Sequence, residues 1–139
     1  MLPKISQPVF ELVLPSTKQK VKYRPFTVAE EKILLVARES GDINDIVNAY
    51  KAIIQNCCLG ALDPDKLASF DMEYIFICIR AKSVGNILEL TVKEDDGKEY
   101  HSAISLDEIV VTEQVGSGVI TLDDESITLV LRHPIVSDL

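Results

Sequence analysis

Basic residues are scarce in this chain, where 14 lysines and arginines face 22 aspartates and glutamates. Affinity for nucleic acid comes mainly from basic groups that displace counterions, so the net charge of -8 argues against such a partner. Long apolar runs are lacking as well. No stretch approaches the ~20 residues that cross a bilayer, and the first residues lack the apolar segment of a signal peptide. We therefore expect no nucleic acid and no membrane as partners, and folding in a cytoplasm.

Cysteine is too scarce and too poorly spaced for a disulfide framework. Cys57 and Cys58 are adjacent, and Cys78 has no close partner in the sequence. A structural zinc site needs four ligands, usually in two closely spaced pairs, whereas His101 and His133 each stand alone. A reactive thiol needs a nearby histidine and a positive environment. We expect all three cysteines to be small, buried apolar side chains.

Catalytic motifs are also lacking. The acidic runs Glu94–Asp96 and Asp123–Glu125 carry groups used in acid–base chemistry and in cation sites. Both runs fall in predicted hairpin turns, where acidic residues are common and solvated. Gly116–Gly118 lacks the lysine and the following helix of a phosphate-binding loop. We predict no enzyme activity, no catalytic, cofactor-binding or metal-binding residues, no cofactor and no small-molecule substrate.

The chain does contain enough apolar sequence for a core, with 47% hydrophobic residues, which argues against disorder. Residues 9–14 and 20–23, separated by the turn signal Pro15-Ser16-Thr17, predict an N-terminal β-hairpin. Thr27 followed by Glu30 is the signature of a capping box at a helix start. Helical spacing predicts that four apolar residues form the buried face of this helix: Ala29, Ile33, Val36 and Ala37.

Two more helices are predicted before the strand-forming last third of the chain. Asp42 is a good N-cap for a second helix, whose apolar stripe runs from Ile43 to Cys57. Asp63-Pro64 predicts a short helical turn over residues 64–68. A third helix is expected over residues 70–82, with Ser83-Val84-Gly85 ending it.

The last third of the chain is typical of antiparallel strands. Residues 87–92 and 99–104 flank the turn Asp95-Asp96-Gly97, which predicts a hairpin. Residues 109–112 are predicted as a further strand, and residues 119–122 and 126–132 as a final hairpin.

This order of elements predicts an α+β fold with an N-terminal β-hairpin, a three-helix segment and C-terminal antiparallel β-strands. We expect one domain over residues 1–139, with a subdivision into 1–85 and 86–139 as the alternative. The pattern leaves open whether the N-terminal hairpin joins the later strands in one sheet.

Two short segments carry residue types that are enriched at protein interfaces. Tyr23, Arg24 and Phe26 lie between the hairpin and the first helix, and Arg80 and Lys82 lie at the end of the third helix. We predict these five as candidate partner contacts. The simpler interpretation also stands: Phe26 packs on the core, and the two cations interact with the helix dipole.

In order along the chain, seven segments resemble the baseplate hub protein family of T4-like bacteriophages. They are residues 2–5, 10–17, 21–26, 30–35, 39–42, 70–76 and 80–85. The end, residues 127–134, is again similar to that family. Many relatives carry a cysteine-paired, zinc-ribbon-like insertion where this chain has residues 93–102 without cysteine, so no metal role is carried over. Relatives also often continue further, so this chain is expected to be a short or truncated member.

The resemblance implies a non-enzymatic structural component of a contractile tail baseplate, near the central hub. It implies other baseplate or hub proteins as partners, held through protein–protein interfaces, with exposed strand edges available for pairing. The expected location is the virion tail, after synthesis in the host bacterial cytoplasm. Two alternatives stay open: a transient hub assembly chaperone that the mature particle lacks, and a small tail-associated hydrolase.

Overall fold

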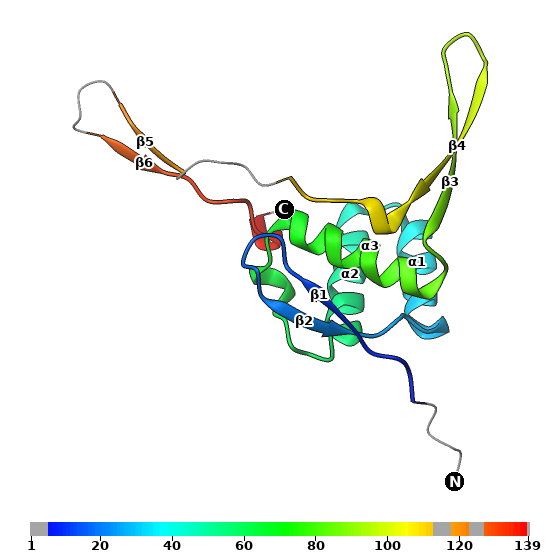
Figure 1. Cartoon of the computed structure of the whole chain (residues 1–139), viewed down its shortest axis with the longest axis horizontal. Coiled ribbons are helices and arrows are strands. Elements are labelled where there is room, and N and C mark those ends of the chain that lie inside the picture. Colours follow the sequence, from blue (N-terminus) through cyan, green and yellow to red (C-terminus); the bar gives the residue numbers. More distant parts are fainter. Residues whose placement is uncertain (1–5, 113–117, 123–126, 139) are drawn as a thin grey trace.

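The N-terminal hairpin forms as predicted in the computed structural model, which describes residues 6–112, 118–122 and 127–138 (Figure 1). Strand β1 (Phe10–Val13) pairs antiparallel with β2 (Lys20–Tyr23), and Leu12 lies opposite Val21. These two side chains are buried, while the lysines of β2 face solvent. The alternation in the sequence therefore reflects a hairpin with one face on the core.

Helix α1 (Val28–Ser40) begins at the predicted capping box and ends at Gly41 in the left-handed conformation. Its predicted buried face is wrong except for Ala37, because Val36 is 68% exposed and Ile33 lies at the surface. Ala29 is exposed too. Relative to the prediction, the helix is rotated so that Glu30, Leu34 and Ala37 face the body. The inward Glu30 pairs with Arg24.

Helices α2 (Ile43–Cys57) and α3 (Ser69–Ser83) supply the centre of the core. Ile53, Ile54, Ile75 and Ile79 are fully buried, and they pack with Leu14 of the hairpin turn in one cluster. The short 3-10 helix η1 (Pro64–Lys66) joins the two helices, as Asp63-Pro64 predicted. The predicted α+β fold is confirmed.

The strands after α3 form two further hairpins. Strand β3 (Ile87–Lys93) pairs with β4 (Glu99–Ser105), and β5 (Val119–Thr121) pairs with β6 (Thr128–Val130). Within the described ranges, the N-terminal hairpin joins neither of them, since each sheet has two strands. Figure 1 shows both later hairpins projecting away from the helices in different directions.

The predicted strand over residues 109–112 is wrong. After β4, the chain turns into the 3-10 helix η2 (Leu106–Glu108), and the Leu106 N–H donates to the Asn86 carbonyl at 2.7 Å. This bond closes the base of the β3–β4 hairpin. No strand within the described ranges pairs with residues 109–112, so their β-forming side chains make no ladder there.

After β6 the chain returns to the body. The Ser69 N–H donates to the Pro134 carbonyl at 3.0 Å, and the Val136 N–H donates to the Leu67 carbonyl at 2.9 Å. Val136 opens the 3-10 helix η3 (Val136–Asp138) and is 1% exposed within the core cluster. The β5–β6 hairpin is therefore a loop whose far end is fixed to the start of α3.

Candidate interaction surfaces

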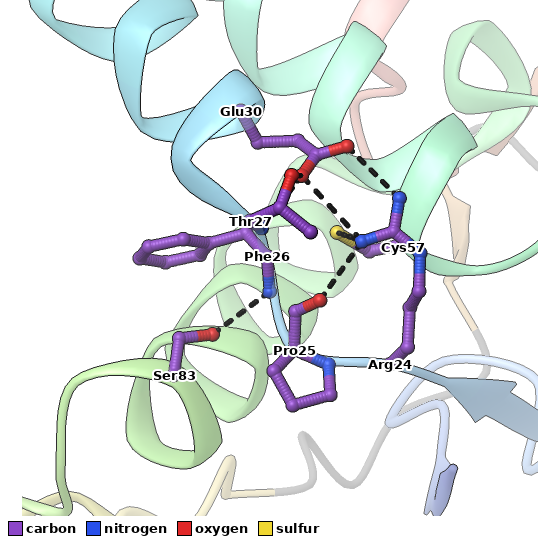
Figure 2. A network of polar contacts seen from close by, with 7 residues as sticks. All are labelled: Arg24, Pro25, Phe26, Thr27, Glu30, Cys57 and Ser83. Carbon is purple, nitrogen blue, oxygen red and sulfur yellow. Dashed lines mark hydrogen bonds and ion pairs between the residues drawn. The ribbon is translucent and has the colours of Figure 1, made fainter. Parts of the chain in front are cut away.

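Arg24 links the N-terminal hairpin to α1 and α2. Its backbone N–H donates to the Cys57 carbonyl at 3.0 Å, and its guanidinium donates to Glu30 Oε1 at 2.9 Å and to the Pro25 carbonyl at 2.9 Å. Figure 2 shows this guanidinium between the end of α2 and the first turn of α1. The side chains of Arg24 and Glu30 are only 18% and 6% exposed, so the ion pair lies largely inside the protein.

The same carboxylate caps α1. Glu30 Oε2 accepts the Thr27 N–H at 2.7 Å and the Thr27 hydroxyl at 2.5 Å, which confirms the predicted capping box. The neighbouring Phe26 N–H donates to the Ser83 hydroxyl at 3.0 Å, as Figure 2 also shows. Burial raises the pKa of Glu30, but the bonds from Arg24 and Thr27 outweigh it and lower the pKa to about 2.

We expect this shift to make the protein sensitive to acid. A carboxylate whose folded pKa lies below its usual 4.5 stabilises the fold above pH 4.5, and that stability is lost as pH falls toward 2. The pKa difference corresponds to roughly 3 kcal/mol. Urea unfolding at several pH values should therefore show a smaller loss between pH 5 and pH 2 in Glu30→Gln than in the unmodified chain.

Asp138 is the background in this measurement, because its pKa is also lowered to about 2, by Arg132 and by the Ile135 N–H. Both proteins retain it, so the difference between them isolates Glu30. The exposed substitution Glu11→Gln is the control and should leave the acid profile as it is. Parallel pH profiles for Glu30→Gln and the unmodified chain would contradict the assignment.

The structure brings the predicted contact residues together around the hairpin and the end of α3. Tyr23 is 4% exposed, and its ring lies 5.8 Å from that of Phe10. Lys82 Nζ lies 5.5 Å from the centroid of the Phe10 ring, and Arg80 buries one guanidinium nitrogen, Nη1, that has no hydrogen-bond partner. Of the five residues only Lys82 is classed as exposed, and its side chain is 38% exposed, so the contacts seen here are internal. A partner contact at these positions stays a prediction.

The β3–β4 hairpin, here the first arm, has one apolar face. Residues that pair across the strands share a face, and even-numbered pairs such as Leu88 with Ile104 lie opposite odd-numbered pairs such as Lys93 with Glu99. The even-numbered face is apolar apart from Ser102 and comprises Leu88, Leu90, Val92, Tyr100 and Ile104. Leu88 is half-buried near the body, whereas Val92 and Tyr100 are 55% and 51% exposed, so the described part of the chain leaves the outer part of this face open to solvent.

The β5–β6 hairpin, here the second arm, is apolar to a still greater degree. Ile120 pairs with Leu129, and the Leu122 N–H donates to the Ile127 carbonyl, which places these four side chains on one face. All four are between 43% and 49% exposed. The other face carries Val119 and Val130 beside two threonines. An isolated two-stranded hairpin is marginally stable in water, so both arms are surfaces suited to a partner.

A third apolar surface results from the rotation of α1. Ile33 and Val36 line an open groove between α1 and α2, of about 520 Å³, with Ala49 of α2 at its base. Single exposed apolar residues are ordinary, but here they adjoin a hollow. The sequence pattern missed this surface because it assigned the same two side chains to the core.

The cysteine thiols are buried or half-buried, and the titratable side chains of the described residues do not gather in a metal-binding group. Cys57 and Cys58 are fully buried as predicted, and burial raises the pKa of their thiols to about 11 and about 12. Cys78 is half-buried. No three histidine, cysteine, aspartate or glutamate side chains meet in a metal-binding group among residues 6–112, 118–122 and 127–138.

One of the acidic runs singled out in the sequence lies at the end of the first arm. Glu94–Asp96 forms the predicted turn of the first arm, while most of Gly116–Gly118 and all of Asp123–Glu125 lie outside the described residues. His101 contacts the Thr91 hydroxyl at 3.0 Å, and His133 lies edge-on to Phe70. Neither histidine meets a thiol or a second histidine in these contacts. In the part of the chain that the structure describes, no helix is long and apolar enough to span a bilayer.

The described residues thus form an α+β body that carries two hairpins with exposed apolar faces. The family model for the T4 bacteriophage base plate protein matches residues 7–139, and the chain belongs to this family. No curated protein and no solved structure matches the chain. The resemblance drawn from the sequence is thereby confirmed.

Membership in this family establishes the general function of the protein. The protein has a structural role in a phage baseplate, which places it in the virion tail among other baseplate proteins. Sequence reasoning offered the strand edges of this region for pairing but missed the apolar faces of the two arms as candidate contacts. For the first arm the signal was present in the period-two pattern around Asp95-Asp96-Gly97, because the turn sets the register and the register sets the shared face.

Proposed function

We propose that this protein is a structural component near the central hub of a contractile tail baseplate, and that its arms hold neighbouring baseplate proteins. Its role is non-enzymatic. The family match supports the baseplate assignment, and the hub position rests on the resemblance of the segments along residues 2–85. The function follows from surfaces, since the reactive groups of the described residues are buried or isolated.

The observation that carries the proposal is the exposed apolar face on each arm. On the first arm Val92 and Tyr100 are 55% and 51% exposed, and on the second arm Ile120 and Leu129 are 47% and 45% exposed. Contiguous apolar surface of this kind marks contact sites in soluble proteins. Two arms that project in different directions offer contact sites to more than one neighbour.

The test is the composition and structure of finished particles. Quantitative mass spectrometry of purified virions should find the chain at a fixed number of copies per tail. Cryo-electron microscopy of the same tails should place it beside the tail axis, with both arms against other proteins. Presence in assembly intermediates together with loss from mature virions would instead identify a transient assembly chaperone.

A further inference from the structure

The first arm shows what kind of partner covers it. Its apolar face consists of Leu88, Leu90, Val92, Tyr100 and Ile104. The opposite face carries charged and polar pairs, among them Lys93 with Glu99 and Thr91 with His101. A ribbon with one apolar and one polar face buries the apolar one and leaves the other in solvent. The arm is therefore suited to contact a partner through its apolar face, with its polar face in solvent.

Charges on the strands argue against pairing by an edge. Glu89, Lys93 and Glu99 lie along the two strands, and each strand of the hairpin is an edge strand. Charged side chains, lysine above all, are the usual means by which proteins prevent strand addition at an edge. The strand pairing expected from the sequence is thus a weaker account of this arm than docking by its apolar face.

The charged side chains of the arm indicate which charge the partner carries near the tip. Residues 87–105 contain five carboxylates and two lysines. Lys93 Nζ lies 2.6 Å from Glu99 Oε1, and Lys98 Nζ lies 3.2 Å from Asp96 Oδ2, so both cations already have partners. Among the described residues, no cation pairs with the carboxylates that remain, Glu89, Glu94 and Asp95. Two of these three lie in the turn at the tip.

We propose that the apolar face of the first arm docks on a different baseplate protein, along an apolar strip that ends in a cluster of lysine and arginine side chains. The inference rests on the proposed function and specifies the partner. An apolar centre with a charged margin is the usual anatomy of an interface, and Tyr100 is of the type that dominates binding energy. A second copy of this chain is a poor occupant, because each copy carries a net charge of -8 and would meet like charge at the tip.

Photo-cross-linking from the two faces of the arm tests the docking mode. A benzophenone amino acid is placed at position 100 of the full chain, in cells that produce the phage, and at the adjacent position 101 as the matched control. Since Tyr100 and His101 lie on opposite faces, the first should cross-link about tenfold more to one tail protein. Mass spectrometry of the cross-linked peptide should find lysine or arginine beside apolar residues.

A charge reversal at the tip tests the polarity of the contact. Asp95→Lys should lower the cross-link yield from position 100 about fivefold or more, whereas Glu31→Lys on the exposed side of α1 should leave it unchanged. Equal yields from positions 100 and 101, or cross-linking to a second copy of the chain, would overturn the inference. Particles that contain the chain but give no cross-link from position 100 would overturn it and leave the proposed function intact. Mature particles without the chain would contradict the proposed function itself.

Discussion

Replacement of Arg24 by methionine should destabilise the protein by about 3–5 kcal/mol, because it leaves the Glu30 carboxylate buried without its cation. The side chain is replaced by one of similar length, so the loss is mainly electrostatic. The Glu30 side chain is 6% exposed, and water cannot replace the guanidinium there. Urea unfolding followed by circular dichroism measures the change.

Two variants make this result specific. Lys20→Met breaks the ion pair with Glu11 at the surface of the same hairpin and should cost under about 1 kcal/mol. Arg24→Met combined with Glu30→Gln removes the buried charge and keeps an oxygen that can accept from Thr27, so it should recover much of the loss. A cost for Arg24→Met no larger than that of Lys20→Met would refute the view that this pair holds the hairpin to the helices.

The second large effect is expected in assembly. Ile120→Ser with Leu129→Ser changes one cross-strand pair of the second arm, on the face where both side chains are exposed. The free energy of unfolding of the body should stay within about 0.5 kcal/mol of the original, because no core contact is lost. The amount of chain in purified tails should fall about tenfold or more, since apolar anchors supply most of the energy of an interface.

The matched control lies one residue along each strand. Thr121→Ser with Thr128→Ser changes the neighbouring pair, which faces the other way and keeps its polarity. It should assemble normally. If the Ile120 and Leu129 variant assembles as well as this control, while both proteins remain folded, the second arm is not an anchor.

Much of this fold is predictable because its signals are local. The Thr27 and Glu30 capping pair, the Asp42 N-cap and Gly41 act within a few residues, and each marks a helix end where expected. The rotation of α1 was not predictable from apolar spacing, because a charged residue, Glu30, faces the body and pairs there with Arg24. The strand expected over residues 109–112 failed for a similar reason: β-forming side chains need a neighbour, and the sequence does not supply its position.

The arms show a further limit of sequence patterns. Leu88, Leu90 and Val92 alternate with polar residues, which indicates a strand with one buried face. The same pattern arises whether that face is buried in the chain's own core or by another protein. Only the structure shows that the face is exposed, and it thereby changes an apparent core strand into a candidate interface.

The return of the chain after the second arm has a mechanical consequence. One root of the loop is held where Leu106 packs at the base of the first arm, and the other where Val136 enters the core beside Leu67. Because each root is held by its own contacts, opening of the β5–β6 pair alone would not detach either end of the arm from the body.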